Sequence, residues 1–537
     1  YASWTFRKQP KFFDVVTFTT NSNNGATFSH NLGSVPGCLI VKATGSSDSW
    51  IVWHRGLTGG IDTNVMVLNA TNAQFSIGTN TSVTSTTVTI GNGSLTYQNA
   101  PYVAYLFAHN AGGFGLTGTD NVISCGSYTG NGSTSGPTVT LGYEPQWLLI
   151  KNASSAMGWY VVDNMRGFPN GASLFPNDSI AESNALSTAI QINATGFKLT
   201  QDWAAINASG STYIYIAIRR GPMKVPTDGT TVFQPATYTG NTPETGRVFT
   251  SSITVDAILN SSRSMSADPN VHGLFSRLIG TGGLLTNATD AENASQDVNW
   301  AYQTGYKSPT NTSTPWNNNA SAYVSYRFRR APGFFDEVCY TGTGVAGPVN
   351  HNLGVAPELI IVKCRNQASR NWIVGSSPTG WTGGNAVLYL DQTDGLLGSN
   401  YWNATNPTST QFSVGITPYV NASTLTYVAY LFATLAGISK VGSYTGNGSS
   451  QTINCGFAAG ARFILIKRTD STGDWYVWDT ARGIVSANDP HLSLNTTAAE
   501  VTGDDSIDPD NSGFIVNQNV TTNINVNTAT YIYLAIA

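Results

Sequence analysis

Charged side chains are scarce in this sequence: Asp, Glu, Lys and Arg make up 10% of its 537 residues, and the formal net charge is −4. Nucleic-acid-binding domains usually carry a basic patch and a high isoelectric point, so this balance argues against a nucleic-acid partner. Long apolar runs are also missing, and we expect no segment that inserts in a membrane. The chain is long enough for several domains.

Cysteine is rare as well, and the five residues are scattered. They are too few for a disulfide framework, and none has the Cys-x-x-Cys spacing of a metal site. We therefore interpret them as small buried hydrophobic residues. They are Cys38, Cys125, Cys339, Cys364 and Cys455.

The motifs of common enzyme chemistry are absent too. Two Gly-x-Gly-x-x-Gly matches, at 113–118 and 342–347, open no predicted helix, so they lack the mechanism that binds a phosphate. His30 and His351 each begin the sequence His-Asn-Leu-Gly. We interpret this duplicated motif as a structural turn, because a catalytic site seldom needs duplicating. The sequence thus predicts a protein that is not an enzyme and has no cofactor.

Two groups of charged residues have structural interpretations. Asp163 with Arg166, and Asp479 with Arg482, are predicted to form internal ion pairs that close a loop. The run 504–513 gathers oxygen ligands suited to Ca²⁺, but it lacks the bidentate Glu at the required offset. We favour a solvated acidic loop there and predict no metal site.

Internal repetition is what the chain has in abundance. The segment Gly-Ser-Tyr-Thr-Gly-Asn-Gly-Ser occurs at 126–133 and again at 442–449. In both copies an apolar run ends in a lysine, with a tryptophan eight residues later: Lys151 and Trp159, then Lys467 and Trp475. We call this unit B.

A second unit, A, also occurs twice. Phe-Phe-Asp, His-Asn-Leu-Gly and the closing run Tyr-Val-Ala-Tyr-Leu-Phe are found within 12–107 and again within 334–432. A more divergent unit, C, lies between the two A–B pairs and closes with Tyr323-Val-Ser-Tyr-Arg-Phe328. At the start, Trp4-Thr-Phe-Arg-Lys8 resembles Tyr326-Arg-Phe-Arg-Arg330, so we expect a further unit before it.

The local patterns indicate β-structure throughout. The closing runs, such as 213–218 and 531–536, alternate aromatic and aliphatic residues over the length of a strand. Asn-Gly and Thr-Gly-Asn-Gly clusters supply the positive φ that hairpin turns need. A single short helical turn is expected, at Ile180 to Leu186.

Each unit has room for the strands of an antiparallel sandwich. We predict an all-β chain, a tandem array of about five antiparallel β-sandwich modules of about 100 residues each. We also expect 334–537 to fold alone. The predicted segments are 1–10 (the last strand of a preceding module), 11–111 (A1), 112–225 (B1), 226–331 (C), 332–436 (A2) and 437–537 (B2).

Basic residues and a proline mark three of the joints. They occur at Arg7 to Pro10, Arg219 to Pro222 and Arg327 to Pro332. Because a guanidinium can bond several carbonyls at once, these clusters fit a stiff, ordered joint. A charged loop in solvent explains the same pattern.

Tryptophan occupies two kinds of position. Trp50, Trp159, Trp372 and Trp475 share one repeat position and are expected in the core. A second set has no counterpart in the sister units and lies among Asn, Ser and Thr. Such residues suit stacking on a sugar, which makes them candidate glycan contacts, but packing against a neighbouring module or subunit would bury them instead. This set is Trp203, Trp300, Trp316, Tyr401 and Trp402.

A family resemblance rests on four segments: 4–14, 30–37, 102–108 and 213–220. They resemble the β-repeat modules of virion proteins of marine tailed phages, especially cyanophages, which are often labelled tail-fibre or structural proteins. Unit C departs from the pattern, because Ile258-Leu-Asn-Ser-Ser262 lacks the lysine ending and the tryptophan after it. The resemblance implies a virion-surface role and no established catalytic residues.

The leading hypothesis is a structural virion-surface protein of a tailed phage, a fibre or appendage that presents a host-recognition surface. Its expected partners are other copies of the chain, with a homotrimer favoured by analogy, other virion proteins, and a host-surface glycan. One alternative is a polysaccharide-binding or polysaccharide-degrading tailspike, which would need paired carboxylates in one cleft to cut glycans. Others are a bacterial surface adhesin and a capsid decoration protein.

Overall fold

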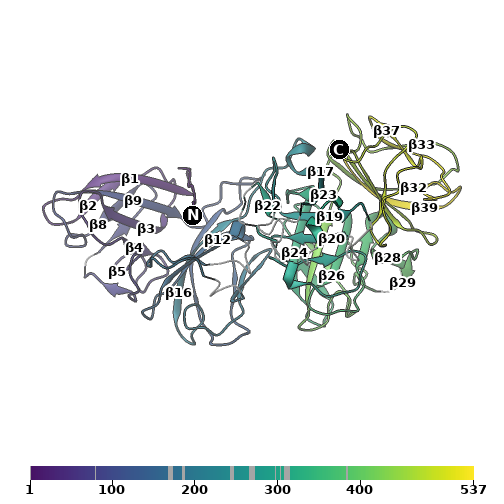
Figure 1. Ribbon diagram of the computed structural model, residues 1–537. Coiled ribbons are helices and arrows are strands. Elements are labelled where there is room, and N and C mark those ends of the chain that lie inside the picture. The colour runs from purple at the N-terminus through teal and green to yellow at the C-terminus, as the bar shows by residue number, and fades with distance from the viewer. Residues whose placement is uncertain are drawn as a thin grey trace. The chain divides into compact units, whose positions relative to one another are not determined.

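The chain is all-β and consists of β-sandwich modules with antiparallel sheets, as the sequence predicts (Figure 1). By its contacts it divides into two compact units, Tyr1–Met223 and Lys224–Ala537, called unit 1 and unit 2 below. The computed structural model describes residues 2–78, 80–115, 117–166, 173–183, 188–241, 247–264, 272–296, 298–300, 302, 304–307, 315–382, 385–398 and 400–537.

Unit 1 contains two sandwiches, within the segments A1 and B1. The A1 sheets have the orders β1-β9-β3-β4-β5-β6 and β2-β8-β7, and the B1 sheets have the orders β10-β16-β12-β13 and β11-β15-β14. The A1 strands are β1 (Phe13–Thr19), β2 (Ala26–Ser29), β3 (Pro36–Ala43), β4 (Ile51–His54), β5 (Asn64–Val67), β6 (Phe75–Ser76), β7 (Ser82–Val83), β8 (Thr87–Ile90) and β9 (Pro101–Ala108). The B1 strands are β10 (Ile123–Thr129), β11 (Thr138–Thr140), β12 (Pro145–Asn152), β13 (Trp159–Asp163), β14 (Ile190–Asn193), β15 (Gly196–Leu199) and β16 (Thr212–Arg219).

Unit 2 begins with the sandwich of segment C. Its sheets have the orders β17-β23-β19-β20-β21 and β18-β22. Its strands are β17 (Phe233–Thr239), β18 (Val248–Thr250), β19 (Ala257–Ser262), β20 (His272–Ser276), β21 (Leu284–Leu285), β22 (Gly305–Lys307) and β23 (Ala322–Phe328).

The A2 and B2 sandwiches complete unit 2. Their larger sheets have the orders β24-β31-β26-β27-β28-β29 and β32-β39-β34-β35-β36, and their smaller sheets are β25-β30 and β33-β38-β37. The A2 strands are β24 (Phe335–Thr341), β25 (Gly347–Asn350), β26 (Leu359–Cys364), β27 (Ile373–Ser376), β28 (Asn385–Tyr389), β29 (Leu397–Gly398), β30 (Gln411–Val414) and β31 (Thr426–Phe432). The B2 strands are β32 (Ser439–Thr445), β33 (Gln451–Asn454), β34 (Phe463–Arg468), β35 (Trp475–Asp479), β36 (Leu492–Ser493), β37 (Ile507–Asp510), β38 (Gly513–Val516) and β39 (Thr530–Ile536).

The closing strand of every module lies inside the larger sheet, between the first strand and the next long one. In β39, Tyr531, Tyr533 and Ala535 pack into the core of their own sandwich. The alternate residues Ile532, Leu534 and Ile536 pack into a second core that several modules share. Because successive side chains of a strand point to opposite faces, this strand is buried on both sides, which explains its nearly continuous apolar sequence.

Regular helix contributes little to the described residues. The short 3₁₀ turns are η1 (Asn164–Arg166), η3 (Gly229–Thr231), η4 (Ala294–Gln296), η5 (Pro315–Asn317) and η6 (Ser377–Thr379). The helical turn expected at 180–186 is not found at 180–183, and 184–187 lie outside the described residues. Among the described helices, none has the length and apolar character to cross a membrane.

Two of the three joints with basic residues are held by buried ion pairs, whereas Arg7 to Pro10 is exposed to solvent. Arg330 is 2% exposed, and its Nε lies 3.3 Å from Oδ1 of Asp336. Nε of Arg220 likewise lies 3.3 Å from Oε1 of the buried Glu144. Of the two interpretations that the sequence left open, the structure favours the stiff joint at Arg220 and Arg330 and the solvated loop at Arg7 to Pro10.

Candidate functional site: the core shared by three modules

The three modules of unit 2 pack around one apolar core. It includes Phe328 of C, Phe335 and Phe432 of A2, and Phe463 of B2, all of them buried. The ring of Phe328 lies 5.4 Å from that of Phe335, 5.8 Å from that of Phe432 and 6.4 Å from that of Phe463. We call this set and the residues clustered with it the shared core.

A small cavity lies within the shared core, with side chains of all three modules around it. Its volume is ≈ 50 Å³, and Ile258, Phe335, Ile361 and Leu534 are among the residues that line it. A cavity of this size has room for a few waters, but its apolar wall offers them no hydrogen-bond partners. The cavity is therefore a packing defect where three sheets meet.

Tryptophan side chains connect neighbouring modules. Nε1 of Trp372 in A2 donates to the carbonyl oxygen of Leu285 in C at 2.8 Å. Nε1 of Trp475 in B2 donates to the carbonyl oxygen of Tyr389 in A2, also at 2.8 Å. Leu285 lies on β21, the edge strand of the larger sheet of C, and Tyr389 lies on β28, the last strand but one of the larger sheet of A2. In unit 2 the repeated tryptophan thus secures A2 to C and B2 to A2.

Module C has a histidine, His272, where the other modules have this tryptophan. His272 is opposite Ser261 in the pairing of β19 with β20, as Trp475 is opposite Lys467 in B2. Burial lowers the pKa of His272 to about 4, while the backbone of Ser493 in B2 acts in the opposite direction. His272 is therefore neutral and lies against B2, but among the described residues its Nε2 has no hydrogen-bond partner, so it does not repeat the tryptophan bond.

A backbone hydrogen bond repeats at all three interfaces. Each accepting carbonyl lies two residues after the repeated lysine or its counterpart Ser261. The contacts therefore run in one direction around a ring: A2 on C, B2 on A2, and C on B2. The three bonds are Glu292 N to Arg365 O at 2.7 Å, Leu396 N to Thr469 O at 2.8 Å and Glu500 N to Arg263 O at 3.2 Å.

Buried lysines also tie modules together. Nζ of Lys467 donates to the carbonyl oxygens of Thr393 in A2, at 2.7 Å, and of Gly473 in its own module, at 2.5 Å. Burial lowers its pKa to about 8. A lysine with a lowered pKa can act as a nucleophile, but here two carbonyl oxygens already hold the ammonium group. Its role is positional.

The predicted ion pair between Asp479 and Arg482 is confirmed, with Nε of Arg482 2.5 Å from Oδ2 of Asp479. The structure extends this pair into an intermodule network that the sequence did not predict. Glu500 of B2 accepts hydrogen bonds from Arg263 of C, the shortest at 2.8 Å, and its Oε1 lies 3.3 Å from Nη1 of Arg482. The hydroxyl of Tyr326 in C donates to Oδ2 of Asp479 at 2.8 Å.

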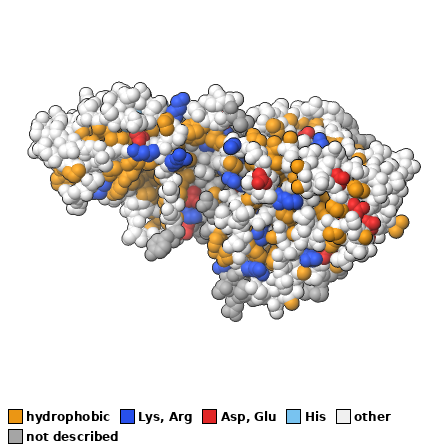
Figure 2. Space-filling model, turned by 90° about the horizontal axis from the view of Figure 1, so that it is seen from above, with side chains coloured by type: hydrophobic (Ala, Val, Ile, Leu, Met, Phe, Trp, Pro, Cys, Tyr) orange, Lys and Arg blue, Asp and Glu red, His pale blue; other side chains and the backbone are white. Residues whose placement is uncertain are grey.

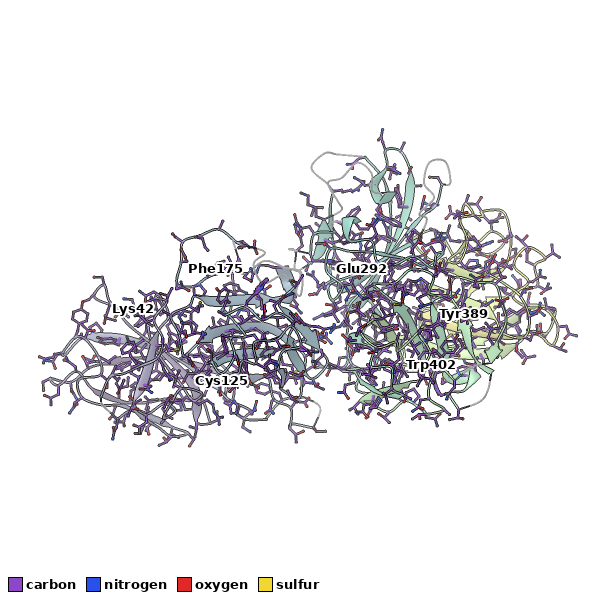
Figure 3. All side chains as sticks on the ribbon, turned by 90° about the horizontal axis from the view of Figure 1, so that it is seen from below. Lys42, Cys125, Phe175, Glu292, Tyr389 and Trp402 are labelled. Carbon is purple, nitrogen blue, oxygen red and sulfur yellow. The ribbon has the colours of Figure 1, made fainter. Side chains whose placement is uncertain are left out.

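A second charged contact joins A2 to C. Nε of Arg365 lies 2.6 Å from Oε2 of Glu292, which Figure 3 labels together with Tyr389. Arg365 is also the residue whose carbonyl accepts the backbone bond from Glu292. The sequence pattern did not reveal this contact, because the residue two positions after the repeated lysine differs between the units: it is Thr44, Ala153, Arg365 or Thr469.

The two repeated histidines have the structural role that was predicted. Nδ1 of His30 accepts from the backbone N–H of Leu32 at 3.2 Å, and Nδ1 of His351 accepts from Leu353 at the same distance. Both rings are buried, which lowers the pKa of each. These imidazoles close the turn of the His-Asn-Leu-Gly motif.

Most of the candidate glycan contacts are buried rather than at the surface, and they pack in the core of their own module rather than against a neighbouring one. Trp300, Trp316, Tyr401 and Trp402 are each at most 5% exposed. The loops that carry them fold back over their own sandwich, and Trp402 packs edge-on against Trp381 in the A2 core. Trp203 alone of the five is exposed, at 39%.

The acidic run 504–513 is held by hydrogen bonds within the protein. Nδ2 of Asn517 donates to Oδ1 of Asp505 and Oδ2 of Asp508, each at 2.8 Å. Nδ1 of His491 lies 3.2 Å from Oδ1 of Asp504. In the part of the chain that the structure describes, no group of three His, Cys, Asp or Glu residues could hold a metal ion.

All five cysteines are buried and unpaired, as expected, including Cys125, which Figure 3 labels. Sγ of Cys125 donates to the carbonyl oxygen of Ala108 at 3.3 Å, so this thiol lies where B1 meets A1. Burial raises the pKa of Cys125 well above its usual value. These thiols are packing residues rather than nucleophiles.

Comparison with known proteins places the chain in a family. No curated protein matches its sequence. Among solved structures, one titled "Crystal Structure of the STIV MCP" matches with a TM-score of 0.15 and 10% identity, covering 38% of this chain and 95% of that chain, a likeness too low to carry an argument. A family model described as "Domain of unknown function (DUF7483)" matches residues 7–222 and 228–537, one match in each unit. The chain therefore belongs to the DUF7483 family.

Proposed function

We propose that this chain is a structural, non-catalytic component of a tailed-phage virion, a fibre or appendage at the particle surface. The observation that carries the proposal is the ring of equivalent contacts by which C, A2 and B2 enclose the shared core. Repeated modules joined in this way form a stiff body without a cofactor. The family resemblance in the sequence supplies the virion context.

The use of the charged groups supports a structural role. Three charged side chains in B2 are buried, and their hydrogen bonds and ion pairs help to join B2 to C. They are Asp479, Arg482 and Glu500. Lys467 is similarly held by carbonyl oxygens. These four charged groups are thus engaged in contacts that stabilise the fold.

A host-glycan contact belongs to the same proposal at one position. Trp203 exposes its indole beside Asp202, which is also exposed, and a flat apolar face next to polar groups suits a sugar ring. A homo-oligomer remains part of the proposal as well. Because three modules of one chain already form a closed ring, unit 2 does not need three chains for three-fold packing.

Electron microscopy of the particle that contains this chain tests the proposal. Gold-labelled antibodies raised against residues 224–537 should bind an external fibre or appendage. Label on bacterial cell surfaces in the absence of phage would favour an adhesin, and label spread over the capsid would favour a decoration protein. Depolymerisation of host polysaccharide by the purified chain would favour a tailspike and contradict a non-catalytic role.

A further inference from the structure

In unit 1, modules A1 and B1 meet as A2 and B2 do. Nε1 of Trp159 donates to the carbonyl oxygen of Val67 at 2.8 Å, as Trp475 does to Tyr389. The backbone N–H of Gln74 donates to the carbonyl oxygen of Ala153 at 2.9 Å, which repeats the bond at Thr469. Two of the three modules of the ring seen in unit 2, and the one interface between them, are therefore present in unit 1.

Residues 2–8 occupy the position of the closing strand of a C module. Nε1 of Trp4 donates to Oδ2 of Asp163 at 3.2 Å, as the hydroxyl of Tyr326 does to Asp479. Nζ of Lys8 lies 3.2 Å from Oδ1 of Asp14, as Arg330 lies 3.3 Å from Asp336. Residues 2–8 of unit 1 thus repeat the polar contacts that β23 and the joint after it make in unit 2.

The ring of Phe6 reproduces the contacts of Phe328 in the shared core. Phe6 lies 5.5 Å from Phe13, 6.0 Å from Phe107 and 6.0 Å from Trp147. The last two are edge-on contacts, as are those of Phe328 with its counterparts in A2 and B2. Residues 2–8 therefore follow the path of a C-type closing strand.

In unit 2, module C covers the surface of A2 around Trp372. The equivalent surface of A1, around Trp50, is open. Trp50 stacks on Tyr105 as Trp372 stacks on Tyr430, with ring centroids 6.0 Å and 6.4 Å apart. Trp372 is fully buried and bonded to module C, whereas Trp50 is only half-buried. Among the described residues no acceptor reaches the Trp50 indole nitrogen.

The lysine beside this tryptophan differs in the same way. Lys42, labelled in Figure 3, is partly exposed, whereas its counterpart Lys363 in A2 is fully buried. Figure 2 shows hydrophobic side chains in patches on the visible face of the part that contains unit 1. Trp50 and Lys42 are therefore more exposed on A1 than their counterparts are on A2, where module C covers Trp372.

The B1 side of unit 1 is open as well. Glu182 lies 2.8 Å from Arg166, as Glu500 lies against Arg482, so the two glutamates are equivalent. The side chain of Glu500 is 7% exposed because Arg263 of module C covers it, whereas that of Glu182 is 46% exposed. A carboxylate that binds a C-module arginine in unit 2 is thus free to bind one in unit 1.

We propose that the open faces of A1 and B1 bind one β-sandwich of the C type, whose closing strand is residues 2–8. The occupant is fixed by continuity: Trp4 and Phe6 already lie in that strand's place, and both faces match those that module C covers in unit 2. This inference does not depend on the virion role. It assigns to unit 1 the same three-module ring.

A grafted chain tests the proposal. Residues 224–325 are placed directly before Trp4 of the full chain, so that Ser325 precedes Trp4 as it precedes Tyr326. Hydroxyl-radical footprinting with mass spectrometry then reports the exposure of each tryptophan. In the original chain Trp50 should be modified and Trp372 should not. In the grafted chain we expect modification of Trp50 to fall at least fivefold, toward the level of Trp372.

The charge at the B1 face provides a matched control. Changing Arg263→Glu in the grafted copy places two carboxylates together at Glu182, so reactivity of Trp50 should partly return. Adding Glu182→Arg restores an opposite pair and should protect Trp50 again. Protection of Trp300, which the grafted copy also carries, shows that this copy is folded.

Two results would overturn the proposal. One is a grafted copy with Trp300 protected while Trp50 stays as reactive as in the original chain. The other is a concentration-dependent dimer of the original chain in which Trp50 becomes protected. That dimer would assign the open faces to a second copy of the chain, and sedimentation equilibrium measured beside the footprinting would detect it.

Discussion

The indole nitrogen of Trp475 donates to the carbonyl oxygen of Tyr389 at 2.8 Å, and this bond is one of those that join the B2 and A2 sandwiches. The same bond joins Trp159 to Val67 and Trp372 to Leu285. An indole is suited to this position because its rings fill apolar space while its N–H reaches one acceptor. The tryptophan repeated in the sequence is thus an intermodule anchor.

Trp475→Phe should destabilise unit 2 by more than the loss of buried apolar area alone would. The substitution removes the hydrogen bond to the carbonyl oxygen of Tyr389, which then keeps only the long 3.4 Å bond from the backbone N–H of Gln392. Trp478→Phe is the matched control, because Trp478 is fully buried in the B2 core and its Nε1 has no partner among the described residues. By urea unfolding, we expect Trp475→Phe to cost about 1–3 kcal/mol more than the control. Equal losses would contradict a bonding role for this indole.

Asp391 should make stability depend on pH. Its Oδ1 accepts from the backbone N–H of Trp372 at 3.0 Å, and burial raises its pKa from 3.8 to about 6. Between these values the folded protein holds a proton that the unfolded chain releases, so the free energy of unfolding falls as pH rises from about 4 to 6. Asp391→Asn removes this group, and a flipped Asn371 amide can keep the contact between the two side chains.

Urea unfolding at several pH values measures this effect. Relative to the original chain, the D391N variant should gain stability between pH 4 and 6 and keep a constant advantage above pH 6. Asn495 occupies the same position in B2, where its Oδ1 accepts from the backbone N–H of Trp475 at 2.8 Å. Asn495→Asp should introduce the pH dependence that Asp391→Asn removes. A difference that does not change with pH in either variant would refute the assignment.

Glu500→Gln and Glu182→Gln should differ strongly in cost. At Glu500 the change weakens buried contacts to Arg263 and Arg482, and we expect a loss of about 2–4 kcal/mol. At Glu182 the carboxylate pairs only with Arg166 in the described contacts and is exposed, so about 0–1 kcal/mol is expected. Calorimetry of the two variants compares them. Similar shifts in melting temperature would show that Arg263 adds little to the Glu500 site.

Trp402→Ala and Trp203→Ala separate a core tryptophan from a surface one. Trp402 packs in the A2 core over Gly375, where an added Cβ would lie 2.5 Å from the Trp402 ring, so its removal leaves a cavity and should cost about 3–5 kcal/mol. Trp203→Ala should change the unfolding free energy by less than about 1 kcal/mol. If a glycan array detects binding, Trp203→Ala should abolish it. Binding that survives this change would place the sugar contact elsewhere.

The sequence predicted those features that depend only on residues within one module. Alternation in the closing runs marked strands such as β39, and the duplicated His-Asn-Leu-Gly motif marked a turn that an imidazole closes. Paired Asp479 and Arg482 were recognisable by their short spacing. Local order of this kind depends on neighbours in the sequence or on the period of a strand.

Two kinds of contact could not be predicted from the sequence patterns: the packing of long loops on their own module, and the contacts between modules. Trp300, Trp316 and Trp402 lie in polar loops, so their burial depends on how each loop folds back. One signal for Trp402 and for Trp316 was available: Gly375 and Gly273 lie within strands, and a glycine there marks close approach of another group. The acceptors Leu285 and Tyr389 act through backbone carbonyls, which any residue has, so no residue type could reveal them.

The expectation that 334–537 folds alone also needs revision, because module C supplies Phe233, Phe328 and Leu259 to the core that A2 and B2 use. Removing C would expose apolar faces that are buried in unit 2. We therefore expect 334–537 to be much less stable than 224–537. Comparing urea midpoints of the two fragments measures the difference, and equal midpoints would show that C contributes nothing to the other two modules.

Differential scanning calorimetry of residues 224–537 tests the central claim most directly. If C, A2 and B2 are built around one core, they unfold together, and the calorimetric enthalpy of a single transition equals its van't Hoff enthalpy. Three separable transitions, each with the enthalpy of one sandwich, would contradict this account, since the modules would then be independent domains that only touch.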